Sequence, residues 1–317
     1  MMKKPNLIGV ATLFAISLTS TFVSAANGEI AVIVKSANSN YWQNVQKGAQ
    51  AAAKEIPKAT VTFQGPASES AVADEVNMVI NAVNRGVSGI VLAASDPDAL
   101  VPAIKQAWEA HIPVVLIDST ISNEGDNYYQ SFLATDNTKA GELCAQRMIE
   151  KVGKTGKIAI MSYVPGAGSE IGRVGGFINY IKEHSNLTIV GPFYSQSQMA
   201  NALNQTTDVL AANPDLKGIY GANEPTAVGM ARGIAQSGKA GKLVAIGFDG
   251  NEDLQNFVKD ETLDSIVVQS SYKMGLDSVT AVAKIIAGAI VPKNIDTGVL
   301  LIDKSNIDSS EARNVLY

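Results

Sequence analysis

The chain has few of the side chains on which most enzymes rely. Its 317 residues include one cysteine, Cys144, and two histidines, His111 and His184. A single cysteine excludes an intramolecular disulfide. Cys144 shares a predicted helical face with apolar residues, where a free thiol behaves as a small hydrophobe. Both histidines fall at the ends of predicted helices, which is typical of surface positions. We therefore expect no catalysis by Cys144.

Motifs of the common catalytic and nucleotide-binding sites are missing too. There is no GxSxG elbow, no HExxH helix and no P-loop. Gly166, Gly168 and Gly172 give GxGxxxG, which misses the spacing of the dinucleotide fingerprint. Reductases with looser glycine spacing need a Tyr-x-x-x-Lys pair, and no tyrosine here has a lysine four residues on. The sequence therefore predicts a protein that is not an enzyme and uses neither cofactor nor metal.

Clusters of positive charge and long apolar runs are scarce as well. Lysine and arginine number 25 against 30 acidic residues, and no segment gathers them into a stripe. That pattern argues against nucleic acid as a partner. Beyond the first 25 residues no window approaches 18 apolar residues without charges, so we expect no membrane span.

The first residues have the pattern of an export signal. Lys3 and Lys4 precede an apolar run from Leu7 to Val23, which closes on the small residues Ser24 and Ala25. We predict a signal peptide over residues 1–25, a mature chain beginning near Ala26 and a location in the periplasm. A lipoprotein would need a cysteine at the start of the mature chain, and the single cysteine of this sequence is Cys144. Without the two lysines the count is 23 basic against 30 acidic residues, a formal charge of −7.

What the sequence does have is a regular alternation of apolar strands and amphipathic helices, which predicts an α/β fold. The first set has strands at 30–34, 60–63, 89–93, 112–117 and 132–134, with helices at 41–56, 71–84 and 97–110. The second set has strands at 157–162, 187–190, 217–221, 243–248 and 264–268, with helices at 138–151, 169–183, 198–212, 225–236 and 251–259. Two sets of similar size predict two similar lobes. A helix at 271–287 fits either one.

Polar residues stand at or just after the ends of three of these strands. Asp118 ends VVLID, Asn223 ends GIYGAN and Asp249 ends VAIGFD. In open α/β sheets the ligand crevice lies outside the carboxyl ends of the strands, so these side chains are candidates for a shared pocket. For Asp249 the alternative is a cap for the helix that begins near Asn251.

Two further stretches add candidate ligand contacts. KSANSNYW follows the first strand and ends in Tyr41 and Trp42. Adjacent rings point to different faces of a helix, so we expect that they are not both in the core. One reading is a core ring beside a surface ring; the other is stacking on a flat apolar ligand face. Lys35, in the same stretch, is either a contact or a solvated side chain. Arg173 lies in GSEIGRVGGF, just inside a predicted helix.

Carboxylate, guanidinium and amide groups at strand ends, with aromatic rings nearby, suit binding without reaction. The hydroxyls of a neutral polyol both donate and accept hydrogen bonds, and these side chains satisfy them in a fixed geometry. Hydrogen bonds to charged groups contribute about 1.5–3 kcal/mol each, so a few of them suffice for tight binding. A sugar is the simplest ligand.

The chain resembles the ribose-type family of periplasmic sugar-binding proteins that serve ABC transporters. The resemblance covers essentially the whole mature sequence. It is carried by IAVIVKSANSNYW, GIVLAASDPDAL, IPVVLIDS, LATDNTKAG, GRVGGF, GIYGANEPTAVG, VAIGFDG and IVVQ. It implies two Rossmann-like lobes, each a parallel sheet flanked by helices, with the ligand between them. Three crossovers near residues 135, 269 and 297 would form the hinge. The lobes would then be residues 26–135 plus 270–297 and residues 136–269 plus 298–317.

The resemblance also implies a set of ligand-binding residues. The family's ring-stacking aromatics match Tyr41 and Trp42, and its first-lobe carboxylate matches Asp118. Its second-lobe and hinge hydrogen-bonding residues match Arg173, Asn223, Asp249 and Gln269. Where the ribose pattern has an asparagine and an arginine, this chain has Ser39 and Ser119. We include these two serines and Lys35 in the candidate site, and the departures argue against ribose itself.

The resemblance leaves more than one class of ligand open and implies which partners the protein has. Lys35 and VTFQGPASES resemble the branch that binds autoinducer-2, a furanose-like signal, although that branch does not usually keep an arginine at the place of Arg173. A transcription factor with the same core would need an N-terminal helix-turn-helix where the signal peptide stands. A sugar-modifying enzyme, the third alternative, is weakened by the missing acid-base pairs. The expected partners are a monosaccharide or related polyol, an inner-membrane ABC permease and a chemoreceptor. We expect a monomer that does not bind nucleic acid.

Overall fold

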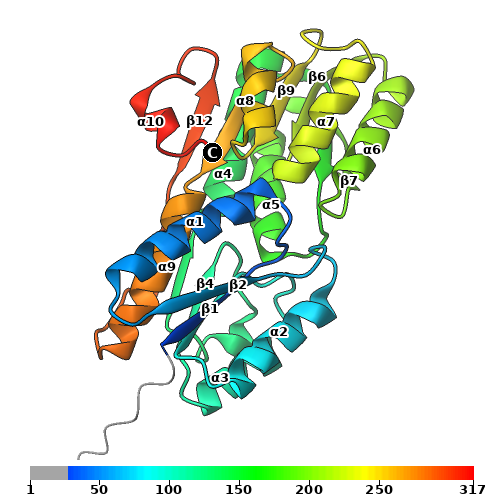
Figure 1. The fold of residues 1–317 in the computed structure, drawn as a ribbon. Coiled ribbons are helices and arrows are strands. Elements are labelled where there is room, and N and C mark those ends of the chain that lie inside the picture. Colours follow the sequence, from blue (N-terminus) through cyan, green and yellow to red (C-terminus); the bar gives the residue numbers. More distant parts are fainter. Residues whose placement is uncertain (1–27) are drawn as a thin grey trace, which may run out of the picture.

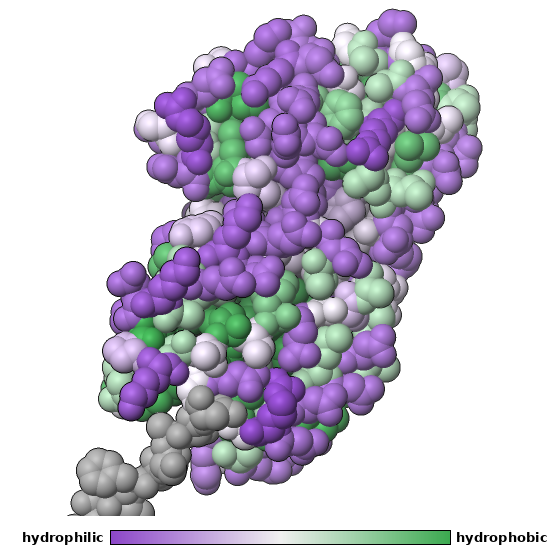
Figure 2. Space-filling view, in the orientation of Figure 1, coloured by the Kyte–Doolittle hydropathy of each residue, from purple (hydrophilic) through white to green (hydrophobic). Residues whose placement is uncertain are grey.

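A computed structural model describes residues 28–317, so the predicted signal peptide lies outside the described residues. The chain forms two lobes joined at a waist, and each lobe is a six-stranded sheet between helices (Figure 1). The predicted α/β class with two lobes is thereby confirmed. On the face shown in Figure 2, mainly hydrophilic residues cover the waist. No helix of the described part is long and apolar enough to cross a membrane.

The first lobe has a fully parallel sheet in the order β11-β5-β4-β3-β1-β2. Its strands are β1 (Glu29–Ile33), β2 (Thr60–Gln64), β3 (Gly89–Leu92), β4 (Val114–Ile117), β5 (Ser131–Ala134) and β11 (Asn294–Asp296). Its helices are α1 (Asn40–Glu55), α2 (Val72–Asn84), α3 (Val101–Glu109) and α9 (Ser271–Ile286), with the short η1 (Asn123–Gly125). In Figure 1, α1 and α9 lie on one face of the sheet and α2 and α3 on the other.

Strand β1 shows why the strands of this sheet are continuously apolar. Ile30 and Val32 pack into one hydrophobic cluster with residues of α1 and α9. Ala31 and Ile33 point the other way, into the cluster formed with α2 and α3. Helices cover both faces of a parallel sheet, so the side chains on both sides of a strand have to be apolar. The apolar runs of the sequence follow from this burial.

The second lobe repeats the arrangement with one difference. Its sheet has the order β12-β10-β9-β8-β6-β7, and β12 runs antiparallel to β10. Its strands are β6 (Thr155–Ser162), β7 (Asn186–Tyr194), β8 (Leu216–Gly221), β9 (Val244–Phe248), β10 (Ser265–Gln269) and β12 (Val299–Asp303). Its helices are α4 (Asn137–Val152), α5 (Gly168–His184), α6 (Met199–Ala212), α7 (Glu224–Gln236), α8 (Glu252–Lys259) and α10 (Ser310–Arg313). The other strand pairs of this sheet are parallel, as expected.

The chain passes between the two sheets three times. It leaves the first sheet after β5, returns to the first lobe between β10 and α9, and leaves it again between β11 and β12. The third passage lies against the first, because the Thr297 amide donates to the Ala134 carbonyl at 2.9 Å. The lobe boundaries and the hinge remain predictions, because the structure describes one arrangement of the lobes.

Some elements differ from the sequence-based expectation. Helix α3 begins at Val101 rather than at residue 97, because the Asp96 carboxylate accepts from the amides of Asp98 and Ala99 and holds a turn there. Helix α9, which fitted either lobe, packs on α1 in the first. Strands β11 and β12 were not predicted from the sequence.

Candidate functional site

Nine of the ten candidate residues line one small cavity between the lobes. They are Lys35, Ser39, Tyr41, Trp42, Asp118, Arg173, Asn223, Asp249 and Gln269. The tenth, Ser119, lies behind this wall and accepts a hydrogen bond from Lys35. Most of these residues follow strands or begin helices at the carboxyl ends of the two sheets, where a ligand crevice is expected. The structure therefore brings together the residues that the sequence singled out, and whether they bind a ligand remains a prediction.

Lys35 and Asp118 form a buried ion pair at the centre of the first-lobe wall. The Lys35 Nζ lies 2.6 Å from Asp118 Oδ2 and also donates to Ser119 and, across the cleft at 3.2 Å, to Ser169. These bonds occupy its three N–H donors. Lys35 is 2 % exposed, so of its two interpretations the solvated side chain is wrong. It positions Asp118 and Ser119 rather than offering a free cation.

The two adjacent aromatic residues are both buried, contrary to expectation. Tyr41 and Trp42 begin α1, pack edge to face with ring centroids 4.8 Å apart, and belong to the hydrophobic cluster beneath that helix. The start of α1 lies at the waist, where the opposite lobe covers the face that would otherwise be solvated. Each ring keeps a polar contact in the cavity wall: the Tyr41 hydroxyl lies 3.2 Å from Asp118, and the Trp42 Nε1 donates to Glu69 at 3.4 Å.

Asp118 stays ionised despite its burial. Burial alone raises its pKa, but the charges of Lys35 and Arg173 and the hydrogen bonds it accepts outweigh that effect, so the pKa lies below its usual value. Its backbone φ of +60° is unusual for a residue with a side chain, and aspartate is among the few that tolerate it. This conformation turns the chain sharply at the end of β4.

Asp249 follows β9 with the same kind of backbone, at a φ of +77°. It does not cap α8, because Asn251 does so by accepting from the Leu254 amide. The Asp249 oxygens instead accept from the Gln269 amide at 2.9 Å and from the Glu224 backbone at 3.0 Å. Burial raises the pKa of Asp249 to about 6, although Arg173 acts in the opposite direction. The capping interpretation is therefore wrong.

Arg173 is the main cation of the second-lobe wall. Its side chain is buried, and its guanidinium carbon lies 3.7 Å from the centre of the Phe248 ring. It donates twice to Asn137 and once to the Ala222 carbonyl. Three bonds from five N–H donors leave two for other acceptors. Arg173 can thus hold its place in the wall and still donate to a ligand.

The remaining amides complete the wall. Asn223 caps α7 by accepting from the Thr226 amide, while its own amide donates to Ser197 at 2.9 Å. Gln269 donates to Asp249, and its Oε1, though buried, has no partner among the described residues. An unpaired buried acceptor costs free energy unless something donates to it. A ligand hydroxyl could supply that donor.

Sequence reasoning missed five residues of the lining. They are Glu69, Tyr163, Ser169, Glu224 and Pro225. Glu224 and Pro225 stand directly after Asn223 in the sequence, so its neighbours at the start of the next helix could have been included. Glu69 sits in a loop after β2 that has no periodic pattern, and nothing local to that stretch shows that it reaches the cavity.

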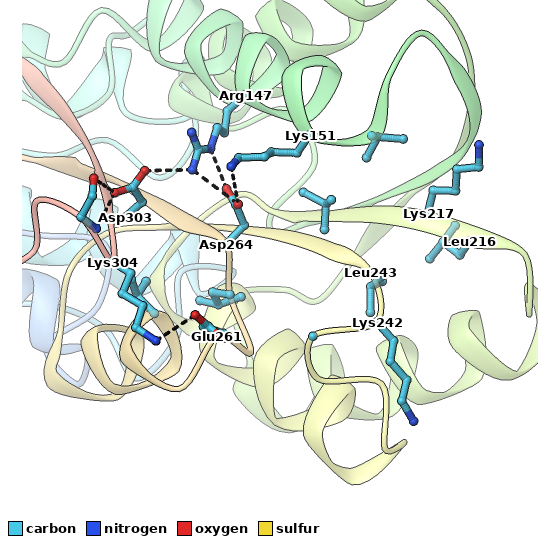
Figure 3. Close-up of a pocket in the computed structure, with 16 residues that line it drawn as sticks. Arg147, Lys151, Leu216, Lys217, Lys242, Leu243, Glu261, Asp264, Asp303 and Lys304 are labelled. Carbon is cyan, nitrogen blue, oxygen red and sulfur yellow. Dashed lines mark hydrogen bonds and ion pairs between the residues drawn. The ribbon is translucent and has the colours of Figure 1, made fainter.

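A larger hollow lies at the far end of the second lobe (Figure 3). It borders the amino ends of β8 and β9, opposite the cleft. Arg147 donates to Asp264 at 2.6 Å and to Asp303 at 2.9 Å, and Lys304 pairs with Glu261. The charged groups of this hollow already pair with one another, and they all belong to one lobe. The hollow is therefore a weaker candidate for the ligand site than the cavity between the lobes.

The cavity offers binding groups rather than a reactive pair. Burial raises the pKa of the Cys144 thiol to about 12, so it remains protonated and inert. Within residues 28–317 no group of three or more His, Cys, Asp or Glu side chains could hold a metal ion. What converges on the cavity is a set of fixed hydrogen-bond donors and acceptors beside aromatic rings.

Comparison with known proteins places the chain in a family. The model of the periplasmic binding protein domain matches residues 30–290, and the chain belongs to this family, whose members here are transport proteins rather than enzymes. An ABC transporter solute-binding protein from Agrobacterium vitis, solved with bound D-fucose, is 69% identical, with a TM-score of 0.91 over 92% of this chain and 100% of that one.

More distant relatives of the chain are also named as sugar-binding proteins. The D-allose-binding periplasmic protein of Escherichia coli is 29% identical over 83% of this chain and 86% of its own length. The ribose import binding protein RbsB of Salmonella typhimurium is 26% identical over 94% and 99%. A carbohydrate transporter solute-binding protein from Agrobacterium radiobacter, in complex with D-arabinose, is 31% identical, with a TM-score of 0.87 over 93% and 100%.

Proposed function

We propose that this protein captures a monosaccharide between its two lobes and delivers it to the membrane permease of an ABC transporter. The observation that carries the proposal is the convergence of Asp118, Arg173, Asn223 and Asp249 on one interlobe cavity. These groups come from both sheets, so a ligand bonded to all of them bridges the lobes. The relatives named above, which are sugar-binding proteins of ABC importers, support the same function.

The chemistry of the wall fits a neutral sugar. Asp118 and Asp249 accept hydrogen bonds from hydroxyls, while Arg173 and Asn223 donate to the hydroxyl and ring oxygens. Tyr41 and Trp42 provide apolar surface for the C–H face of a ring. Each of these groups holds a sugar in place, and none is paired with a nucleophile or a proton relay. We therefore propose that the protein binds its ligand without converting it.

The sugar to test first is D-fucose, because the Agrobacterium vitis relative binds it and shares 69% of the sequence. A panel of D-fucose, D-galactose, D-arabinose, D-allose and D-ribose is screened by thermal shift, and hits are measured by calorimetry. A ligand present at 100 times its Kd stabilises the folded protein by about 2.7 kcal/mol, which is easily detected. We expect D-fucose or a closely related pyranose to give the largest shift.

Two controls make the screen decisive. Mannitol, which has hydroxyls but no ring, should give no shift if the cavity recognises a closed sugar. An Arg173→Met variant should lose the shift with every sugar. If no sugar of the panel shifts the wild-type protein, while autoinducer-2 does, the monosaccharide proposal is wrong and the signal-binding alternative replaces it.

The location and the remaining partners also belong to the proposal. We propose export to the periplasm with cleavage near Ala26, which N-terminal sequencing of the periplasmic protein checks. An intact Met1 on the functional protein would contradict it. We propose that the protein acts as a monomer and that a chemoreceptor recognises its ligand-bound form. Light scattering with and without sugar tests the first point, and a pull-down with receptor ectodomains tests the second.

A further inference from the structure

Two buried glutamates cross the cleft in opposite directions. Glu69, in the loop after β2 of the first lobe, accepts a hydrogen bond from the Ser197 hydroxyl of the second lobe at 2.8 Å. Glu224, the first residue of α7 in the second lobe, accepts from the backbone amide of Asn40 in the first lobe at 3.1 Å. Glu69 and Glu224 are 8 % and 4 % exposed. Each lobe thus sends one carboxylate to a donor on the other.

The Glu69 contact is tied to candidate ligand residues on both sides. Within its own lobe, Glu69 accepts from the Trp42 indole nitrogen at 3.4 Å through its other oxygen. On the far side, the Ser197 hydroxyl accepts from the Asn223 side chain at 2.9 Å. A continuous chain of hydrogen bonds therefore runs from Trp42 through Glu69 and Ser197 to Asn223, and the step between Glu69 and Ser197 is the one that crosses the cleft.

Glu224 is tied to the site in the same way. Its backbone amide donates to Asp249 at 3.0 Å, and its second carboxylate oxygen accepts from the Tyr317 hydroxyl at 2.9 Å. The side chain is therefore held from its own lobe and aimed at Asn40, where α1 begins. Burial, together with the charge of Asp249, raises the pKa of Glu224 to about 8.

The two glutamate side chains stand between the ligand cavity and a second hollow. Both glutamates line both spaces. The second hollow is the outer one, since its lining includes the exposed Asn38, Asn40 and Ala67. A sugar that leaves the inner cavity by this side has to pass between the glutamates, and separating the lobes breaks both crossing bonds.

We propose that Glu69 and Glu224 are positioning residues that latch the two lobes together and so set how long a bound sugar is retained. The proposal rests on the sugar-binding function proposed above. The latch forms when the lobes meet, so it slows ligand release and has little effect on the encounter of the open protein with sugar. A net hydrogen bond of this kind changes an equilibrium by roughly three- to tenfold.

The test removes a latch contact without substituting any residue that lines the inner cavity. Ser197→Ala deletes the donor to Glu69, and Ser197 is absent from that lining. Tyr317→Phe loosens Glu224 and is likewise outside the lining. Ser68→Ala is the matched control, because Ser68 lies beside Glu69 but bonds to Ser70 within its own lobe. Association and dissociation rates of D-fucose, or of the sugar selected by the panel, are measured by stopped-flow fluorescence.

We expect Ser197→Ala to raise the dissociation rate roughly three- to tenfold with an association rate within about twofold of wild type. Tyr317→Phe should change the rates in the same direction, and Ser68→Ala should match wild type. A serine that merely supports the local fold would lower the ligand-free melting temperature and leave the rates unchanged. If both latch variants release sugar at the wild-type rate, the latch is refuted and the sugar-binding function stands. If the wild-type protein binds no sugar, both proposals fall.

Discussion

At the scale of single residues, Asp249 offers the sharpest test of the site. We expect Asp249→Asn to weaken sugar binding by about 1.5–3 kcal/mol, because an amide cannot accept two strong hydrogen bonds from ligand hydroxyls as a carboxylate does. Asparagine also tolerates the positive φ at this position, so the fold should survive. Calorimetry measures the affinity, and thermal unfolding of the free protein measures the stability.

The control for Asp249 is another aspartate that follows a strand. Asp96 lies after β3, is not part of the cavity lining, and holds a local turn through Asp98 and Ala99. Asp96→Asn should leave the affinity unchanged. Unchanged affinity in Asp249→Asn, with a lower melting temperature, would mean that Asp249 holds the backbone of α7 in place and does not bind the ligand.

The burial of Glu75 makes the free energy of unfolding depend on pH. It is fully buried in α2, accepts from the Ser95 amide at 3.0 Å, and has a second oxygen without a partner among the described residues. Burial raises its pKa from 4.5 to about 7. Between these values the folded protein holds a proton that the unfolded chain has lost, so this group makes stability fall as pH rises, by up to about 1.4 kcal/mol per pH unit.

Urea denaturation at pH 5 and pH 7 measures this effect. We expect Glu75→Gln to reduce the difference in the free energy of unfolding between the two pH values, because glutamine does not titrate. The same change at the exposed Glu55 should leave the difference as it is in wild type. An undiminished difference in Glu75→Gln would show that Glu75 is already ionised in the folded protein.

The sequence predicted residues of the site only where a local pattern marked them. Asp118 and Asp249 end apolar runs, and the end of a buried parallel strand is a recognisable place for a ligand group. Tyr163 also stands directly after an apolar strand, β6, so the same rule could have included it. Glu69 carries no such mark, because its approach to the cavity depends on how the two lobes face each other. The ion pair of Lys35 with Asp118 could not be predicted from the sequence either, because it joins residues 83 positions apart.

At the scale of secondary structure elements, the packing of α4 on α5 positions Arg173. A Cβ at Gly141 of α4 would lie 2.0 Å from the Arg173 carbonyl oxygen and 2.8 Å from the Phe177 amide. Both are backbone atoms, so the helices would have to separate. We expect Gly141→Ala to destabilise the protein by about 1–3 kcal/mol and to weaken sugar binding by displacing Arg173. Denaturant unfolding and calorimetry measure the two effects.

Gly175 on α5 is the matched control. A Cβ added there meets no atom within 4 Å, and alanine is a better helix former than glycine by up to about 1 kcal/mol. Gly175→Ala should therefore raise stability slightly and leave the affinity unchanged. If Gly141→Ala were as stable as wild type, the close approach of α4 and α5 would not control the position of Arg173.

The same scale shows which elements could be predicted. The long helices and buried strands have clear apolar periodicity, and their predicted positions lie close to the observed ones. Strand β11 has three residues at a sheet edge, so it lacks the apolar run that marks a core strand. Strand β12 does carry such a run, VLLI at 299–302, and the alternation rule could have identified it. Pairing β12 antiparallel to β10 depends on the last passage between lobes, which no local pattern encodes.

At the scale of the whole molecule, any movement of one lobe relative to the other has to be accommodated by the three segments in which the chain passes between the sheets. We propose that the hinge lies near Thr135, Gln269 and Thr297, where the chain changes sheets. Few residues need to change their dihedral angles there, while each lobe keeps its own core on both faces of its sheet. A ligand that bonds to both lobes favours the closed arrangement through its differential contacts.

Small-angle X-ray scattering tests this movement on the full mature chain. We expect saturating sugar to lower the radius of gyration, because ligand bonds to Asp118 on one lobe and to Arg173 on the other form fully only when the lobes approach. The Arg173→Met variant, measured at the same sugar concentration, should keep the profile of the free protein. We propose that closure also joins surfaces of both lobes into one face, by which a permease distinguishes loaded from free protein. A profile unaltered by saturating sugar, in a protein whose free form is not already closed, would rule out the hinge mechanism.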